Sequence, residues 1–112
     1  MKTIRIANEL YDGPIWTLDE NGYYVDDLPI IKNDSIIKEL RDKISNMWDS
    51  YIEFDSHDQA CWFNKELFLK NIPVMLDLIK QLKNRLNEIN DGSYLIEDIE
   101  TDILNEYLKN NK

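Results

Sequence analysis

The sequence predicts an α+β fold, a small antiparallel β-meander packed against two to three α-helices, followed by a late strand and a short C-terminal helix. The first third alternates apolar and polar residues between turns that contain Gly and Pro, which is typical of strands. From Asp34 onward, apolar residues recur at three- and four-residue spacing, which is typical of helices. At 112 residues the chain supports one hydrophobic core, so we expect a single domain over residues 1–112.

The meander is predicted segment by segment. Ile4 and Ile6 fall on one face of a strand, with Arg5 on the other. The Asn21-Gly22 pair is a strong hairpin signal, because these residue types tolerate the positive φ that tight hairpin turns need. The expected order is a strand at 3–9, a turn at 11–14, a strand at 15–18, a turn at 19–22, a returning strand at 23–25 and a break at 26–29 before a short linker.

A helix is predicted after this linker, with Asn33 or Asp34 as its N-cap. Its stripe of apolar residues extends as far as Ile52. The acidic segment 53–58 then loses the helical period and predicts a loop.

A second helical region is expected to begin with a turn at Ser56 or Asp58, and its apolar stripe ends at Asn90. Pro73 lacks an N–H and clashes with the carbonyl group four residues back, so we expect the region to divide there, with Asn71 capping the second helix. The last predicted features are a helix stop at Gly92, a strand at 93–100 and a helix at 101–108.

Acidity is the most informative property of the composition. The chain has 22 Asp and Glu against 13 Lys and Arg, a net charge of −9. Residues 9–34 hold seven acids and one base, whereas residues 62–90 hold three acids and five bases. Such a surface repels nucleic acid and anionic membranes and attracts a basic partner. The alternative interpretation is that the charge only keeps the protein soluble.

The sequence carries no signal for export or membrane insertion. No apolar run approaches the roughly 18 residues of a membrane span, and Met1 to Arg5 lead into an amphipathic segment rather than a signal-peptide core. Cys61 is the one cysteine, so an internal disulfide is excluded and we expect its thiol in the core. We therefore expect a cytoplasmic protein with no membrane contact.

The motifs of catalysis and metal binding are incomplete. The segment 19–27 does not fit a calcium loop, because Tyr23 and Tyr24 fall at positions five and six, which require an oxygen ligand and a Gly. His57 and Cys61 supply two of the four ligands of a zinc site. Because nucleophile-elbow and phosphate-loop motifs are also missing, we expect no catalytic residue, no metal and no cofactor. The carboxylate pairs that leave a metalloenzyme as an alternative are Asp26 with Asp27 and Asp49 with Glu53.

Aromatic side chains have two interpretations. Trp48, Tyr51, Trp62 and Phe63 lie on apolar stripes and are predicted to be core. Trp16 lies among the acids and tyrosines of the predicted hairpin, so it is either a core residue or a contact for basic side chains of a partner.

The first third also carries a pattern of short strings, namely Ala7-Asn8, Gly13-Pro14-Ile15-Trp16, Asp19-Glu20-Asn21-Gly22 and Asp26-Asp27-Leu28-Pro29. With the Trp62-Phe63-Asn64 step and the long striped helix, this pattern resembles small immunity proteins of bacterial polymorphic-toxin and contact-dependent growth inhibition systems. The resemblance covers residues 4–90. It implies a small cytosolic α/β protein that binds the C-terminal toxic domain of a cognate toxin, commonly a nuclease. Such a protein blocks the active site or substrate surface and catalyses nothing.

The resemblance and the charge both predict a basic protein partner rather than nucleic acid. The rival interpretation is an acidic nucleic-acid mimic that inhibits restriction-type or other nucleases, and such a mimic would bind several unrelated enzymes. The predicted partner-binding residues are Asp12, Trp16, Asp19, Glu20, Asp26 and Asp27 in the meander and Glu53, Asp55 and Asp58 in the acidic loop.

Overall fold

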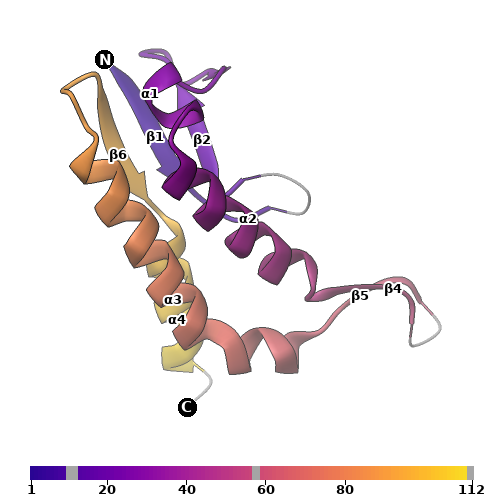
Figure 1. Ribbon diagram of the computed structural model, residues 1–112. Coiled ribbons are helices and arrows are strands. Elements are labelled where there is room, and N and C mark those ends of the chain that lie inside the picture. The colour runs from indigo at the N-terminus through magenta and orange to yellow at the C-terminus, as the bar shows by residue number, and fades with distance from the viewer. Residues whose placement is uncertain (10–12, 57–58, 111–112) are drawn as a thin grey trace.

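The computed structural model describes residues 1–9, 13–56 and 59–110. A four-stranded sheet is covered on one face by helices, and a separate two-stranded hairpin projects from the body (Figure 1). The molecule is elongated, with extents of 47 × 29 × 28 Å. The α+β class predicted from the sequence is confirmed. In chain order the elements are β1 (Lys2–Ile6), β2 (Ile15–Leu18), β3 (Tyr24–Val25), α1 (Pro29–Lys32), α2 (Ser35–Asp49), β4 (Ile52–Ser56), β5 (Gln59–Phe63), α3 (Lys65–Glu88), β6 (Tyr94–Asp98) and α4 (Glu100–Asn110).

The sheet has the strand order β3-β2-β1-β6 and contains the predicted meander. β1 pairs antiparallel with β2, and β2 pairs antiparallel with β3. Ile4, Ile6 and Ile15 are buried against the helices, as period-two alternation requires of a sheet with one covered face. Gly22 has a φ of +83°, the conformation that its place in the hairpin turn needs.

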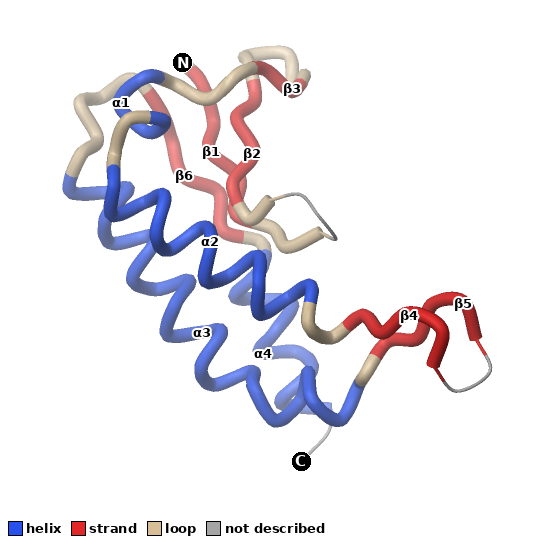
Figure 2. Tube along the Cα trace, turned by 45° about the vertical axis from the view of Figure 1, so that its right-hand side comes forward, coloured by secondary structure: helices blue, strands red, loops and turns tan. Residues whose placement is uncertain are grey.

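The late strand and the C-terminal helix are both present. β6 adds to the free edge of β1 in parallel, because α2, the hairpin and α3 return the chain to the start of β1. The buried Tyr94 hydroxyl donates to the Leu86 carbonyl oxygen at 2.5 Å, which ties the start of β6 to the end of α3. α4 then runs back along α3 (Figure 2).

The two long helices begin at side-chain caps. The Asp34 carboxylate accepts from the Ile37 N–H at 2.9 Å, and the Asn64 side-chain oxygen accepts from the Leu67 N–H at 3.0 Å. The short linker predicted before α2 includes α1, a single helical turn that begins with Pro29, a position where the missing N–H costs nothing.

The prediction that Pro73 divides the second helical region is wrong, because α3 continues through it. Pro73 lies on the exposed side of the helix, while Phe68, Ile72 and Met75 are buried on the other side. Burial of these side chains on both sides of the proline outweighs the lost hydrogen bond. The helix bends near its start instead of breaking (Figure 1).

The predicted acidic loop is also wrong. Residues 52–56 form β4, and Trp62 and Phe63 belong to β5 rather than to a helix, so no helical turn begins at Ser56. The reason is the alternation of Ile52 and Phe54 with acidic residues, a period of two that favours a strand. Asp58, the other predicted start of that turn, lies outside the described residues.

Candidate functional site

The two acidic surfaces predicted from the sequence lie at opposite ends of the molecule (Figure 1; Figure 2). The turn between β2 and β3 lies at the sheet end. The β4–β5 hairpin, which we call the arm, projects from the other end. The chain enters the arm from the end of α2 and leaves it into the start of α3. The structure therefore does not bring the two sets of predicted contact residues together, and each is considered separately.

At the sheet end, most of the described carboxylates serve the fold. Asp19 accepts from the Asn21 and Tyr23 N–H groups at 2.9 and 3.0 Å, which closes the hairpin turn. Glu20 pairs with the N-terminal ammonium group at 2.9 Å. Asp27 accepts from Arg41 at 2.7 Å and from the Thr17 hydroxyl at 3.2 Å. Asp26 is exposed, and Asp12 lies outside the described residues.

Trp16 also has a structural role. It is partly buried, its indole N–H donates to the Ala7 carbonyl oxygen at 2.9 Å, and its ring lies 5.3 Å from that of Tyr24. Gly13 packs beneath it, and a Cβ at Gly13 would lie only 2.6 Å from the Ala7 carbonyl oxygen. The indole therefore holds the loop before β2 against the end of β1.

The arm is acidic by sequence. Residues 44–64 contain Asp49, Glu53, Asp55 and Asp58 and neither Lys nor Arg. Glu53 accepts from the Asn64 side-chain amide at 2.8 Å, a bond that joins the arm to the cap of α3. Asp55 lies in β4 with its side chain outside the described part, and His57 and Asp58 are outside the described residues altogether.

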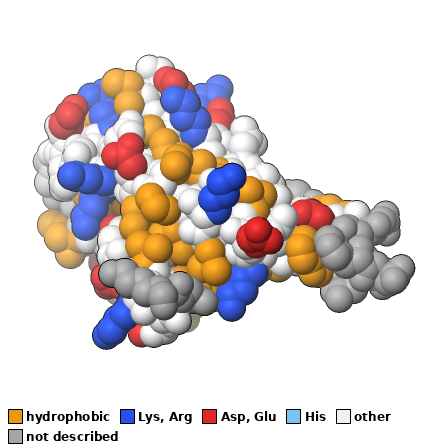
Figure 3. All heavy atoms as spheres, turned by 90° about the horizontal axis from the view of Figure 1, so that it is seen from below, with side chains coloured by type: hydrophobic (Ala, Val, Ile, Leu, Met, Phe, Trp, Pro, Cys, Tyr) orange, Lys and Arg blue, Asp and Glu red, His pale blue; other side chains and the backbone are white. Residues whose placement is uncertain are grey.

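One face of the arm is apolar. The register pairs Ile52 with Phe63 and Phe54 with Cys61, and paired residues of an antiparallel ladder share a face. Phe54 is 54% exposed, Phe63 is 39% exposed, and Cys61 is exposed rather than in the core as predicted. The opposite face carries Glu53 and Trp62, which pair across the two strands between the Ile52–Phe63 pair and the Phe54–Cys61 pair. Figure 3 shows apolar side chains gathered on the body beside the arm and on the arm itself.

Aromatic rings anchor the arm to the body. Phe63 lies 5.5 Å from Phe68, ring centroid to ring centroid, and Phe68 lies 5.0 Å from Tyr107 of α4. Tyr51 is fully buried against the same rings, as predicted, while Trp48 is only partly buried. The arm thus starts from a packed aromatic cluster rather than from a loose loop.

The apolar surface continues from this cluster onto α4. Ile103 and Tyr107 are 44% and 42% exposed, and they line an open hollow of about 450 Å³. Acidic side chains border the hollow, since Asp102 and Glu106 also line it. The arm and the adjoining face of α4 therefore both carry exposed apolar groups beside acidic residues.

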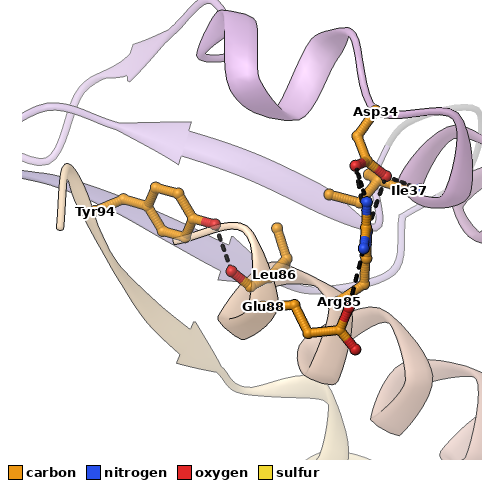
Figure 4. Close-up of polar contacts among 6 residues, drawn as sticks. All are labelled: Asp34, Ile37, Arg85, Leu86, Glu88 and Tyr94. Atoms are coloured by element: carbon orange, nitrogen blue, oxygen red, sulfur yellow. Dashed lines mark hydrogen bonds and ion pairs between the residues drawn. The ribbon is translucent and has the colours of Figure 1, made fainter. Parts of the chain in front are cut away.

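An ion pair fixes the far ends of the two helices that carry the arm (Figure 4). Arg85 of α3 donates to Asp34 at the start of α2, with a shortest distance of 2.7 Å, and also to Glu88 at 2.9 Å. The hydrogen bonds from Arg85 lower the pKa of Asp34, against the opposing effect of burial. Because α2 and α3 are held at this end, the arm has a defined direction at the other.

One buried carboxylate lies away from both acidic surfaces. Glu100, the first residue of α4, is 3% exposed and accepts from the Asn8 N–H at 3.0 Å. Burial raises its pKa, and the nearby Asp98 carboxylate raises it further, while the bond from Asn8 acts in the opposite direction. The bond from the Asn8 N–H lets Glu100 order the segment after β1.

Within the described ranges, no three His, Cys, Asp or Glu side chains are grouped so that they could hold a metal ion. None of the described helices is long and apolar enough to span a membrane. The chain matches no protein-family model, no curated protein and no solved structure.

Sequence reasoning missed the apolar face of the arm. The sequence predicts Phe63 in a helix and predicts Phe63, Trp62 and Cys61 as core. In the structure Phe63 lies in β5 and is exposed, Trp62 is only partly buried and Cys61 is exposed. The signal was present in the first segment, where Ile52 and Phe54 alternate with polar residues up to Ser56, followed by a polar His57-Asp58 step before the second segment. The acids within the first segment favoured a loop and obscured it.

Proposed function

We propose that this protein is a cytosolic immunity protein that binds a cognate toxin domain and neutralises it by covering its active site or substrate-binding surface. The observation that carries the proposal is the arm, because it presents an exposed apolar face within a 21-residue stretch that has four acids and no Lys or Arg. Exposed aromatic groups surrounded by charge of one sign are typical of a surface for a partner of the opposite charge.

A toxin that acts on RNA or DNA suits this surface. Such an enzyme needs a basic substrate site, because phosphate contacts supply much of its affinity. An acidic inhibitor is steered toward that site, and association rates rise by orders of magnitude at low salt. Inhibition by occlusion requires no catalytic group on the inhibitor.

The rival function, a nucleic-acid mimic, is less well supported. A mimic needs carboxylates free to imitate a row of phosphates, whereas Asp19, Glu20 and Asp27 bind groups of their own chain. A mimic would inhibit many unrelated nucleases, and an immunity protein inhibits one type. A panel of basic ribonucleases and deoxyribonucleases separates the two functions.

The experiment that tests the proposal is co-expression with the protein encoded immediately upstream. We expect the upstream protein to arrest growth alone, this chain to restore growth, and the two to co-purify as a one-to-one complex. A harmless neighbour, or a toxic one that is neither bound nor rescued, would count against cognate immunity.

A further inference from the structure

We infer that the arm is the part of this protein that enters its partner, and that it fits a cleft with an apolar floor and a basic rim. The inference rests on the proposed inhibitory function and adds which surface makes the contact and what chemistry receives it. Phe54 and Cys61, side by side on the exposed apolar face, are the central contact.

The dimensions of the arm require a cleft. β4 and β5 have five residues each, so one face of this ribbon measures roughly 17 Å by 10 Å at ordinary strand spacing. A stable protein interface buries about 800 Å² on each partner. A flat partner surface touching one face of the arm supplies only a fraction of that area. A cleft that receives both faces and meets the body at the aromatic cluster can supply it.

The negative charge of the arm favours a cleft with a basic rim. Glu53 lies on the face opposite Phe54, and the hairpin segment 52–63 contains three acids and neither Lys nor Arg. Lys and Arg around the cleft would therefore meet carboxylates. A second copy of this chain would bring an arm of the same charge, so arm-to-arm pairing is disfavoured.

The arm is also held in place before binding. An isolated two-stranded hairpin is marginally stable in water. Here the Asn64 N–H donates to the Tyr51 carbonyl oxygen at 2.6 Å at the base of the arm, and Phe63 packs on Trp48 and Phe68. A segment ordered in advance loses less entropy on binding, which favours a tight complex.

Cys61 gives a direct test, because it is the only cysteine and lies on the apolar face. In the complex with the upstream-encoded toxin domain, we expect the rate of Cys61 modification by a thiol reagent to fall by about tenfold or more, because access controls thiol reactivity. The matched control is Leu95→Cys with Cys61 kept, whose second thiol lies on β6 at the sheet end and should react equally in free and bound protein when each modified cysteine is located by peptide mapping.

A second measurement tests Phe54. Phe54→Ser should weaken the complex by about thirtyfold, the effect of losing a central aromatic contact, while Leu95→Ser should leave affinity unchanged although Leu95 is 60% exposed. Equal Cys61 reactivity in an intact complex, or unchanged affinity of Phe54→Ser, would overturn the inference and leave the inhibitory function standing. If Cys61 becomes protected as the concentration of this chain rises with no toxin domain present, the arm binds a second copy. That result would also overturn the inference. Failure to form any complex would instead remove the proposed function.

Discussion

The sheet end and the arm end of this molecule use polar and aromatic side chains in different ways. At the sheet end, Asp19, Asp27 and Trp16 are bonded to groups of the same chain. At the arm end, rings pack on one another at the base, and Phe54 extends into solvent. Both regions are acidic and aromatic in sequence. Glu53 of the arm is likewise bonded, to Asn64, so the difference lies in the apolar face that the arm exposes and not in free carboxylates.

The largest effect is expected at the base of the arm. Phe68 is buried and touches Tyr51, Phe63 and Tyr107, so Phe68→Ala should lower the free energy of unfolding by about 3–5 kcal/mol. Urea denaturation measures the change. Phe54→Ala is the matched control and should change stability by less than about 0.5 kcal/mol, because Phe54 is exposed. A loss below about 1 kcal/mol for Phe68→Ala would mean that the arm end is not part of the cooperative fold.

The second effect is expected at the ion pair of the sheet end. Asp34→Ala removes the cap of α2 and the partner of Arg85, and should cost about 3 kcal/mol. Glu39→Gln on the exposed side of the same helix removes only a surface pair and should cost less than about 0.5 kcal/mol. Equal costs for the two variants would contradict the structural role of Asp34.

The same pair predicts a pH dependence. The pKa of Asp34 is lowered in the folded protein, so its stabilisation is fully present above the unfolded value of about 3.9. It is lost as pH falls through the folded pKa. Asp34→Ala should therefore show a smaller loss of stability than the wild type as the solution is acidified below pH 4. A parallel decline in both proteins would contradict this assignment.

Charge reversal compares the two acidic surfaces directly. Glu53→Lys with Asp55→Lys in the arm should slow association with the proposed toxin partner by about tenfold at low salt, through lost electrostatic steering. Glu20→Lys with Asp26→Lys at the sheet end makes the same change in net charge and should slow it much less. Stopped-flow association rates at two salt concentrations measure both. Equal slowing by the two pairs would show that net charge, and not the arm, sets the rate.

Much of the fold could be predicted because its signals are local. The alternation of Ile4 and Ile6, the Asn21-Gly22 turn and the cap at Asp34 each depend on a few neighbouring residues, and β1, the β2–β3 turn and α2 follow them. The continuity of α3 depends instead on what Pro73 faces. A proline is tolerated where its neighbours are buried in a core formed by distant segments, and no local pattern reports that.

The candidate site was predicted only in part for the same reason. The sequence predicts Glu53 and Asp55 as contact residues of a loop, whereas they lie in a strand of the arm. Whether Phe54 is exposed depends on which elements reach it, and among the described residues β4 and β5 pair only with each other. The sequence does not reveal the ion-pair partner of Asp27, because Arg41 lies fourteen residues away on α2.

The smallest effect is expected at Glu100, which belongs to neither acidic surface. Burial raises its pKa above the unfolded value of about 4.3, so the charge that forms as pH rises through this range costs the folded protein stability. Glu100→Gln keeps an oxygen that can accept from the Asn8 N–H but never ionises. Between pH 4 and pH 7 the unfolding free energy of this variant should therefore rise relative to wild type, whereas Asp102→Asn, an exposed change on the same helix, should show no such trend. A relative loss of stability for Glu100→Gln over that range would mean that the hydrogen bond to the carboxylate outweighs its burial.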